Sequence, residues 1–176
     1  MTDQLNKPAF PAAMAVPQGD VVKITQGMVN EAVAMSRKSP RKRIIQPFHA
    51  TGDNSLHRMF NVVQKGTYIR AHWHRSPPKD EALILMQGAV HVFIFDDQGK
   101  ILQQFGLKAG TEAFGVDIKA CVCHTFVAME NDTVVFEAKP GPYNPVTDKD
   151  FASWAPEEGT PEAADYLADL YKHVGS

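Results

Sequence analysis

The stretch GTYIRAHWH, residues 66–74, followed by Glu81 and Gly88, decides how this 176-residue chain folds. Alternate side chains of a β-strand point to the same face, so His72 and His74 would lie on one face, about 6–7 Å apart. Two imidazoles at that separation can converge on a single ion between them. Glu81 follows a proline-containing loop, and an antiparallel return of the chain would bring its carboxylate to the same ion.

A third imidazole is available from His124, which begins a late apolar run and would reach the ion from across a closed sheet. Three nitrogens and one oxygen suit Fe(II), Mn(II), Ni(II), Co(II) or Zn(II), and such sites usually keep positions open for water or a substrate. The predicted metal ligands are therefore His72, His74, Glu81 and His124. The pattern leaves the identity of the metal open among Zn, Fe, Mn and Ni.

Two cysteines, Cys121 and Cys123, stand directly before His124. Cys-x-Cys-His could bind zinc together with His72 and His74. In an extended chain, however, both sulfurs would face away from His124, which favours small buried thiols instead. A redox-sensitive lip at the entrance of a pocket is a third interpretation.

Short apolar runs separated by turn residues fill the chain between Ile44 and Lys139. The expected strands cover residues 55–63, 67–74, 81–86, 90–95, 101–107, 113–118, 124–129 and 133–139. Many short strands at this spacing are typical of a sandwich or barrel rather than of a βαβ sheet. The strand region is therefore expected to form one all-β unit.

One helix is expected on each side of the strand region. Thr25 would cap a helix that runs to about Ser36. Thr160 would cap a second, short helix to about His173, with a proline at its first position. The predicted organisation is a flexible leader (1–20), an N-terminal helix and basic connector (21–43), a barrel (44–140) and a C-terminal wrap and helix (141–176). The proline-rich leader and residues 140–160 are suited to covering a sheet edge.

The composition excludes several classes of protein. Hydrophobic residues make up 44% and charged residues 22%, which is ordinary for a globular domain. A formal net charge of -2 argues against a nucleic-acid binder that works through bulk positive charge. No apolar stretch suits a membrane span or a secretory signal, and two unpaired thiols fit a reducing compartment, so we expect a cytoplasmic protein.

The glycines and metal-ligand candidates together resemble the first motif of the cupin superfamily, in which glycines bracket a His-x-His pair and a glutamate. Gly66, His72, His74, Glu81 and Gly88 match it. The spacer between His74 and Glu81 holds six residues, longer than is usual in this motif, and leaves the role of Glu81 open.

The second cupin motif usually reads Pro-x-Gly-x-x-His followed by Asn, and here only its histidine, His124, is present. Lys119 and Cys121 occupy the Pro and Gly positions, and Ala128 replaces the Asn. The turn before His124 is therefore expected to be unusual.

A closer resemblance extends from about Thr25 to Leu170, to the WbuC-type cupin family. It is carried by Ser39-Pro40-Arg41, Phe48-His49, the 58–74 strand pair, Phe95-Asp96-Asp97, Lys139-Pro-Gly-Pro-Tyr143, Asp148-Lys-Asp-Phe151 and Trp154-Ala-Pro-Glu157. The resemblance implies a double-stranded β-helix, or jelly-roll barrel, that holds a metal and is associated with bacterial surface-polysaccharide gene clusters. It also makes a homodimer the default assembly.

Three further residues are candidates for a role in catalysis. Tyr68 and Arg70 share strand phase with His72 and His74, so both are expected to face the barrel interior. Arg70 would pair either with a carboxylate such as Glu137 or with an anionic group of a substrate. Tyr68 could transfer a proton or simply pack in the wall.

His49, in an irregular stretch upstream, would line the mouth as a proton shuttle or remain a surface histidine.

The predicted function is that of a metalloprotein acting on a small carbohydrate-derived or carboxylate-bearing substrate. Isomerisation, decarboxylation and dioxygenation are all open, because one ligand set supports several chemistries. A non-catalytic module that binds or senses a small molecule through the metal is the alternative, and a purely structural metal is the third. The expected partners are a small molecule and a second copy of the chain, with no nucleic acid and no membrane.

Overall fold

The structure, a computed structural model, describes residues 10–174. The elements, in chain order, are α1 (Gln26–Lys38), β1 (Arg43–Pro47), β2 (Leu56–Val63), β3 (His72–Trp73), β4 (Glu81–Gln87), β5 (Ala89–Phe95), β6 (Ile101–Lys108), β7 (Gly115–Ile118), β8 (Cys123–Ala128), β9 (Thr133–Pro140), β10 (Asp150–Phe151) and α2 (Pro161–His173). None of the helices in this part of the chain is long and apolar enough to cross a membrane.

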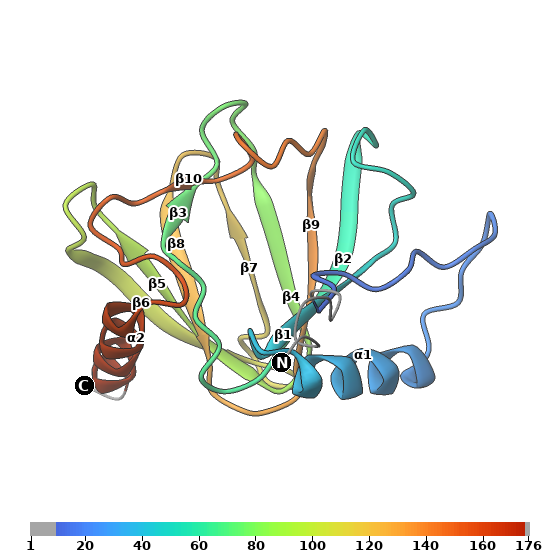
Figure 1. Ribbon diagram of the computed structural model, residues 1–176, viewed down its shortest axis with the longest axis horizontal. Coiled ribbons are helices and arrows are strands. Elements are labelled where there is room, and N and C mark those ends of the chain that lie inside the picture. The colour runs from blue at the N-terminus through green and yellow to red at the C-terminus, as the bar shows by residue number, and fades with distance from the viewer. Residues whose placement is uncertain (1–9, 175–176) are drawn as a thin grey trace, which may run out of the picture.

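The strands form two antiparallel sheets that pack face to face (Figure 1). The first sheet has the order β1-β2-β9-β4-β7 and the second has the order β10-β3-β8-β5-β6. Apolar side chains from both inner faces, among them Leu83, Val92 and Phe126, form the core between the sheets. The predicted all-β jelly-roll with a helix near each end is confirmed.

Each helix covers the outer face of one sheet. Val33 of α1 packs against Phe60 of β2 in a cluster outside the first sheet. Leu167 of α2 packs in a cluster with Phe93 of β5 outside the second sheet. Burial on both faces explains why β5 carries a near-continuous apolar run rather than a strict alternation.

Both helices begin at the predicted capping threonine. The Thr25 hydroxyl accepts a hydrogen bond from the backbone N–H of Met28 at 3.4 Å. The Thr160 hydroxyl accepts one from the backbone N–H of Ala163 at 3.3 Å, and a proline occupies the first turn of α2. Each cap satisfies a backbone donor that has no partner within the helix.

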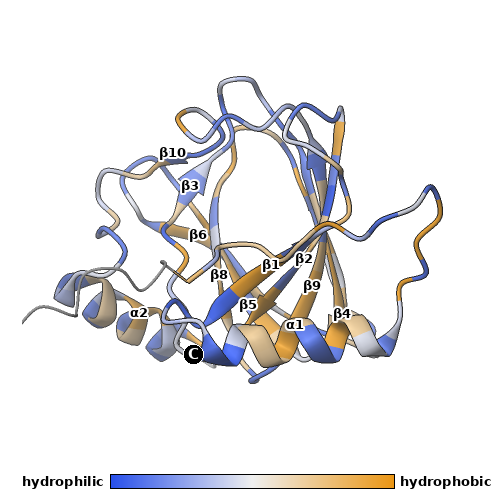
Figure 2. Ribbon diagram, turned by 45° about the vertical axis from the view of Figure 1, so that its right-hand side comes forward, coloured by the Kyte–Doolittle hydropathy of each residue, from blue (hydrophilic) through white to orange (hydrophobic). Residues whose placement is uncertain are grey.

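The two ends of the barrel differ in polarity. The strands are most hydrophobic beside α1 and α2 and most hydrophilic toward β3 and β10 (Figure 2). The apolar end holds the core between the sheets. The polar end is where β3 places the His-x-His pair.

The expected strand over residues 67–74 is shorter in the structure, where β3 covers only His72–Trp73. The preceding backbone makes other bonds: the Ile69 carbonyl accepts from the Thr125 hydroxyl at 2.6 Å, and the Ala71 carbonyl accepts from the Ala152 N–H at 2.9 Å. This part of the chain crosses between the sheets instead of extending one of them. The short strands β1 and β10 were not predicted.

Segments outside the barrel cover strand edges, as predicted. Residues 12–14 run along β1, with a hydrogen bond from the Met14 N–H to the Ile45 carbonyl at 2.8 Å. In the second sheet β10 pairs with β3, so that Phe151 lies opposite His72. The first nine residues of the expected leader lie outside the described residues.

Gly88 lies in the tight turn between β4 and β5, at a position that has no room for a side chain. Its φ is +75°, and a Cβ atom there would lie 2.3 Å from the Thr133 hydroxyl. We expect Gly88→Ala to lower the free energy of unfolding by about 3 kcal/mol or more, because strain and a clash combine. Urea denaturation followed by circular dichroism would measure the change.

Gly110 provides the matched control, because its φ is +72° but a Cβ atom added there would meet nothing within 4 Å. Gly110→Ala should cost about 1 kcal/mol, which is the strain of a left-handed conformation alone. Equal losses in the two variants would show that the contact with Thr133 is unimportant.

Candidate metal centre

Three histidines meet at the polar end of the barrel. His72 lies in β3, His74 follows one residue after the strand, and His124 lies in β8 directly opposite His72 in the sheet register. Each histidine offers a ring nitrogen, and these three nitrogens lie within 4.8 Å of one another. All three side chains are buried. The structure therefore brings the sequence-distant imidazoles to one point.

Backbone carbonyls orient all three rings in the same way. Nδ1 of His72 lies 2.9 Å from the Arg70 carbonyl, and Nδ1 of His124 lies 3.0 Å from the Val122 carbonyl. Nδ1 of His74 bonds to the Asp148 carbonyl. A carbonyl can only accept, so each Nδ1 must carry the proton. Each Nε2 is then left with a lone pair that points at the shared centre.

The Nε2 atoms have the environment of metal ligands. Those of His72 and His74 are buried and have no hydrogen-bond partner among the described residues. Burial lowers the pKa of His72 well below its usual value, with the charge of Lys149 adding to the effect, and burial also lowers the pKa of His74. Both rings are thus held neutral, the form that binds a metal. Buried, unsatisfied nitrogens of this kind fit a divalent transition metal.

Glu81 adds an oxygen to the same centre. Its carboxylate is buried and lies 3.1 Å from Nε2 of His124 and 3.8 Å from Nε2 of His74. The long spacer after His74 is taken up by a loop in which Arg75 and Pro78 form an isolated bridge, so β4 still begins at the site. The structure thus places Glu81 against His124 and His74 despite the unusual spacing, while the group of ligand atoms within 4.8 Å of one another consists of the three histidines.

The contact between Glu81 and His124 also bears on the metal. Burial opposes ionisation of Glu81, but its contact with His124 and the charge of Lys139 hold the pKa of its carboxyl well below the usual range. His124 has an oxygen near both ring nitrogens, the Val122 carbonyl at Nδ1 and the Glu81 carboxylate at Nε2. A divalent cation bound here would be held by Nε2 and the carboxylate together.

A buried ion network lies beside these four residues, and the sequence did not predict it. Asp148 accepts from Lys79 at 2.8 Å and from Lys139 at 3.2 Å. Lys139 also lies 3.1 Å from Glu137. Glu137 and Lys139 alternate along β9, which was the available sequence signal for two inward side chains. The network fixes Asp148, whose carbonyl orients His74.

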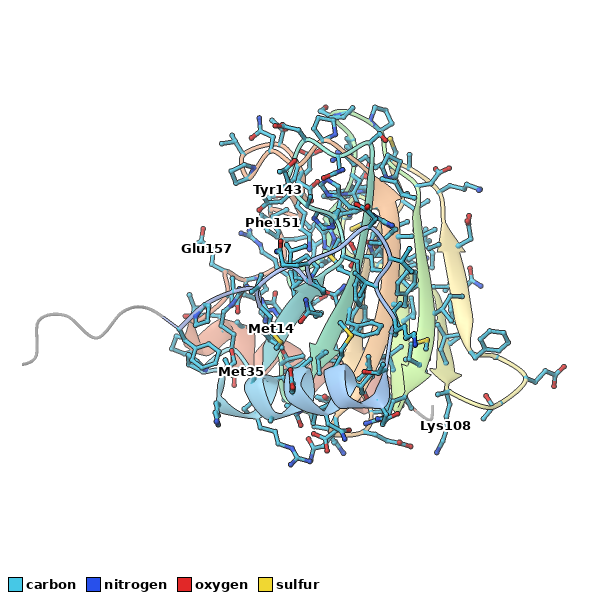
Figure 3. The ribbon with its side chains drawn as sticks, turned by 90° about the vertical axis from the view of Figure 1, so that its right-hand side faces the viewer. Met14, Met35, Lys108, Tyr143, Phe151 and Glu157 are labelled. Atoms are coloured by element: carbon cyan, nitrogen blue, oxygen red, sulfur yellow. The ribbon has the colours of Figure 1, made fainter. Side chains whose placement is uncertain are left out.

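The cluster opens into a cavity of about 750 Å³. His72, Glu81 and His124 line it, whereas His74 is not among the lining residues. One wall is formed by the crossing segment, defined as residues 141–158, which runs from β9 toward α2. Figure 3 shows Tyr143, Phe151 and Glu157 of this segment, all of which line the cavity. A ligand in this cavity can therefore reach His72, Glu81 and His124.

Arg70 lines the cavity, and its guanidinium group donates to the Ala152 carbonyl at 3.0 Å and lies over the Phe151 ring at 5.4 Å. The carboxylate nearest its guanidinium group is that of Glu157, at 3.9 Å, rather than the suggested Glu137, which bonds to Asn61 and Lys139.

His49 also lines the cavity and is partly exposed. Its ring stacks on that of His57 with centroids 4.1 Å apart, and its Nδ1 contacts the backbone of Arg58. His57 also lines the cavity, which the sequence did not predict because this histidine has no candidate partner near it in the chain.

The expectation that Tyr68 faces the barrel interior is wrong. Its hydroxyl donates to the Pro156 carbonyl at 2.8 Å, and its ring packs against Tyr166 of α2 on the outer side of the second sheet. The regular strand does not extend back to residue 68, so the alternation expected from His72 fails. Tyr68 is no longer a candidate for proton transfer at the centre.

Neither cysteine belongs to the cluster of histidines among the described residues. Cys123 points to the outer core beside Trp73 and Phe95, as expected for an extended chain. Cys121 is exposed in the turn before His124 and has φ +65°. A left-handed residue at this position explains why the resembled motif has a glycine there. The zinc-binding Cys-x-Cys-His interpretation is therefore wrong.

The two thiols should differ in reactivity. Burial raises the pKa of Cys123 to about 12, whereas Cys121 is exposed. We expect a disulfide reagent at pH 8 to titrate one thiol per folded chain and two after unfolding, because only an accessible thiolate reacts. Cys121→Ser should leave no reactive thiol in the folded protein; a fast-reacting thiol in that variant would contradict the burial of Cys123.

Comparison with known proteins supports the fold. A family model described as a domain of unknown function (DUF6016) matches residues 24–107. A comparison with curated protein sequences gave no match. Among solved structures, BH2720 from Bacillus halodurans is 18% identical with a TM-score of 0.50, over 74% of this chain and 89% of that chain.

Two further structures are similar over a smaller part of their length. The capsular polysaccharide assembling protein CapF from Staphylococcus aureus is 17% identical with a TM-score of 0.50, over 61% of this chain and 31% of that chain. Oxalate decarboxylase from Lactobacillus farciminis is 18% identical with a TM-score of 0.42, over 56% and 27%. This chain thus spans about a third or less of those two proteins. The chain has the cupin fold.

Proposed function

We propose that this protein is a cupin metalloprotein that binds one divalent transition metal through Nε2 of His72, His74 and His124 and the carboxylate of Glu81. One observation carries the proposal: two buried Nε2 atoms without a hydrogen-bond partner converge with a third imidazole. Leaving buried polar atoms unsatisfied costs about 1–3 kcal/mol each, so their convergence requires a compensating interaction. A bound metal provides it.

The chain's own groups prepare the site before a ligand arrives. The carbonyls of Arg70, Val122 and Asp148 fix the three rings, which reduces the reorganisation needed on binding. When bound, the metal supplies a Lewis acid that polarises a coordinated oxygen group. The cavity reaches three of the four ligand residues, which favours a site that keeps a position for a small molecule over a purely structural one.

We further propose that the bound molecule is small and either carbohydrate-derived or carboxylate-bearing. The cavity is lined by Arg70 and by further charged groups, which suits a polar ligand with oxygen donors. His49 in the cavity wall is the candidate for carrying a proton. A role in bacterial surface-polysaccharide metabolism rests on the sequence resemblance to the WbuC-type family alone.

Metal binding provides the direct test. Equilibrium dialysis of the wild-type protein against Co(II) or Zn(II), followed by elemental analysis, should give one ion per chain. His124→Ala should weaken binding by about 100-fold or more, because it removes a direct ligand and the nearest partner of Glu81. His91→Ala is the matched control, since His91 lies in β5 and bonds to Gln104 away from the cluster. Equal metal content in the two variants would refute the assignment.

Removal of the metal should leave the barrel folded. Three apolar clusters lie apart from the four ligand residues and supply the core without them. A chelator should therefore preserve the far-ultraviolet circular dichroism spectrum. Metal added back at about 100 times its Kd should raise the free energy of unfolding by about 2.7 kcal/mol, by mass action. Complete unfolding on chelation would instead identify a structural metal.

A further inference from the structure

Lys149 is a cation in the cavity wall whose side chain has no partner among the described residues. It lies in the crossing segment between Asp148, which is part of the ion network, and Asp150, which begins β10. Its side chain is half-buried and lines the cavity. Among residues 10–174 it has no ion pair within 4.0 Å and no side-chain hydrogen bond, unlike Lys79 and Lys139.

The position of Lys149 is close to the proposed metal. The register of β10 on β3 places Asp150 opposite Trp73 and Phe151 opposite His72, so Lys149 directly precedes the strand that pairs with the His-x-His segment. The charge of Lys149 acts on both His72 and His74, and for His72 it is the strongest influence of any charged group. The side chain of Lys149 therefore lines the same cavity as His72, Glu81 and His124.

Arg70 faces the same cavity with donor capacity to spare. Its guanidinium group makes one hydrogen bond, to the Ala152 carbonyl, and its buried Nε has no partner among the described residues. Glu157 is 3.9 Å away and its side chain is 79% exposed, so solvent screens that pair. Phe151, two residues after Lys149, contacts both the Arg70 guanidinium group and the His72 ring.

Lys149 is the cation of this site that has no carboxylate within ion-pair distance among the described residues. Four carboxylates, Glu81, Glu137, Asp148 and Glu157, face four cations, Lys79, Lys139, Lys149 and Arg70, and the ion pairs among them leave out Lys149. At the mouth, Arg41 and Arg43 are both paired with Glu158. A divalent metal would leave an excess of positive charge. An excess of this kind in a half-buried site is stabilised by a bound anion.

We propose that Lys149 and Arg70 together form an anion subsite beside the metal, and that the ligand of this site is a small carboxylic acid rather than a neutral sugar. This inference rests on the proposed metal function and narrows its ligand class. Arg70 presents a planar donor fork that matches a carboxylate, and Lys149 adds a point charge near His72. An oxygen substituent next to the carboxylate would lie toward the metal.

The test uses two probes that differ in charge but hardly in shape, glycolate and glycolamide. Protein loaded with Co(II) is titrated with each probe, and the visible absorption of the cobalt reports a ligand that enters its coordination shell. We expect glycolate to bind at least about tenfold more tightly than glycolamide, because charge-assisted hydrogen bonds are roughly twice as strong as neutral ones.

Lys149 itself is tested by Lys149→Met, which removes the charge and keeps an unbranched side chain. Glycolate binding should weaken by about tenfold or more, with unchanged cobalt content and an unchanged spectrum before the probe is added. Lys149→Arg should restore most of the affinity. Lys100→Met, at an exposed position in the turn between β5 and β6, is the control and should bind glycolate as the wild type does.

The outcomes separate this inference from the metal assignment. Equal affinity for the two probes, no spectral response to glycolate, or wild-type glycolate binding by Lys149→Met would overturn the anion subsite while leaving the metal site intact. Failure of the protein to load cobalt would overturn both.

Discussion

Three hydrogen bonds from imidazole Nδ1 atoms to backbone carbonyls hold the candidate site together. They settle which nitrogen of each ring carries the proton, and so they aim three lone pairs at one point. Because the acceptors are backbone atoms, the orientation depends on the path of the chain and not on the choice of neighbouring side chains. The polar end of the barrel is organised around this constraint.

The crossing segment extends the constraint beyond the barrel. Asp148 is held in place by its backbone and by its side chain. Its carbonyl accepts a hydrogen bond from His74, and its carboxylate accepts from Lys79 and Lys139. Breaking one partner of such a buried network is strongly unfavourable, because it leaves a charge without compensation. The position of the segment and the geometry of the ligand cluster are therefore coupled.

Much of the fold could be predicted from the sequence because its signals are local. Turn residues between apolar runs located most strands, and Thr25 and Thr160 located both helix starts. Proximity of His72, His74 and His124 followed from strand alternation and motif spacing. The short strands β1 and β10 were missed because each depends on a partner distant in the chain.

The errors at the site have the same origin. Tyr68 was placed inside by extending the alternation of His72 backward, but the chain leaves the sheet before that point. The network of Lys79, Lys139 and Asp148 joins three segments, and no spacing rule connects them. Lys149 could likewise be placed near the site only from the pairing of β10 with β3, which the sequence did not predict. The sequence predicted features that depend on the pattern within one strand, but it did not predict contacts that form only when the barrel closes.

The barrel and the crossing segment supply different residues to the site, which bears on how ligand specificity can change between related proteins. The proposed metal ligands come from β3, β4, β8 and the residue after β3, whereas Lys149 and Phe151 belong to the crossing segment. Substitutions in that segment could alter which molecules are accepted while the coordination chemistry stays the same. Proteins that share this barrel could bind different ligands by changes in this one segment, provided that Asp148 and its contacts are kept.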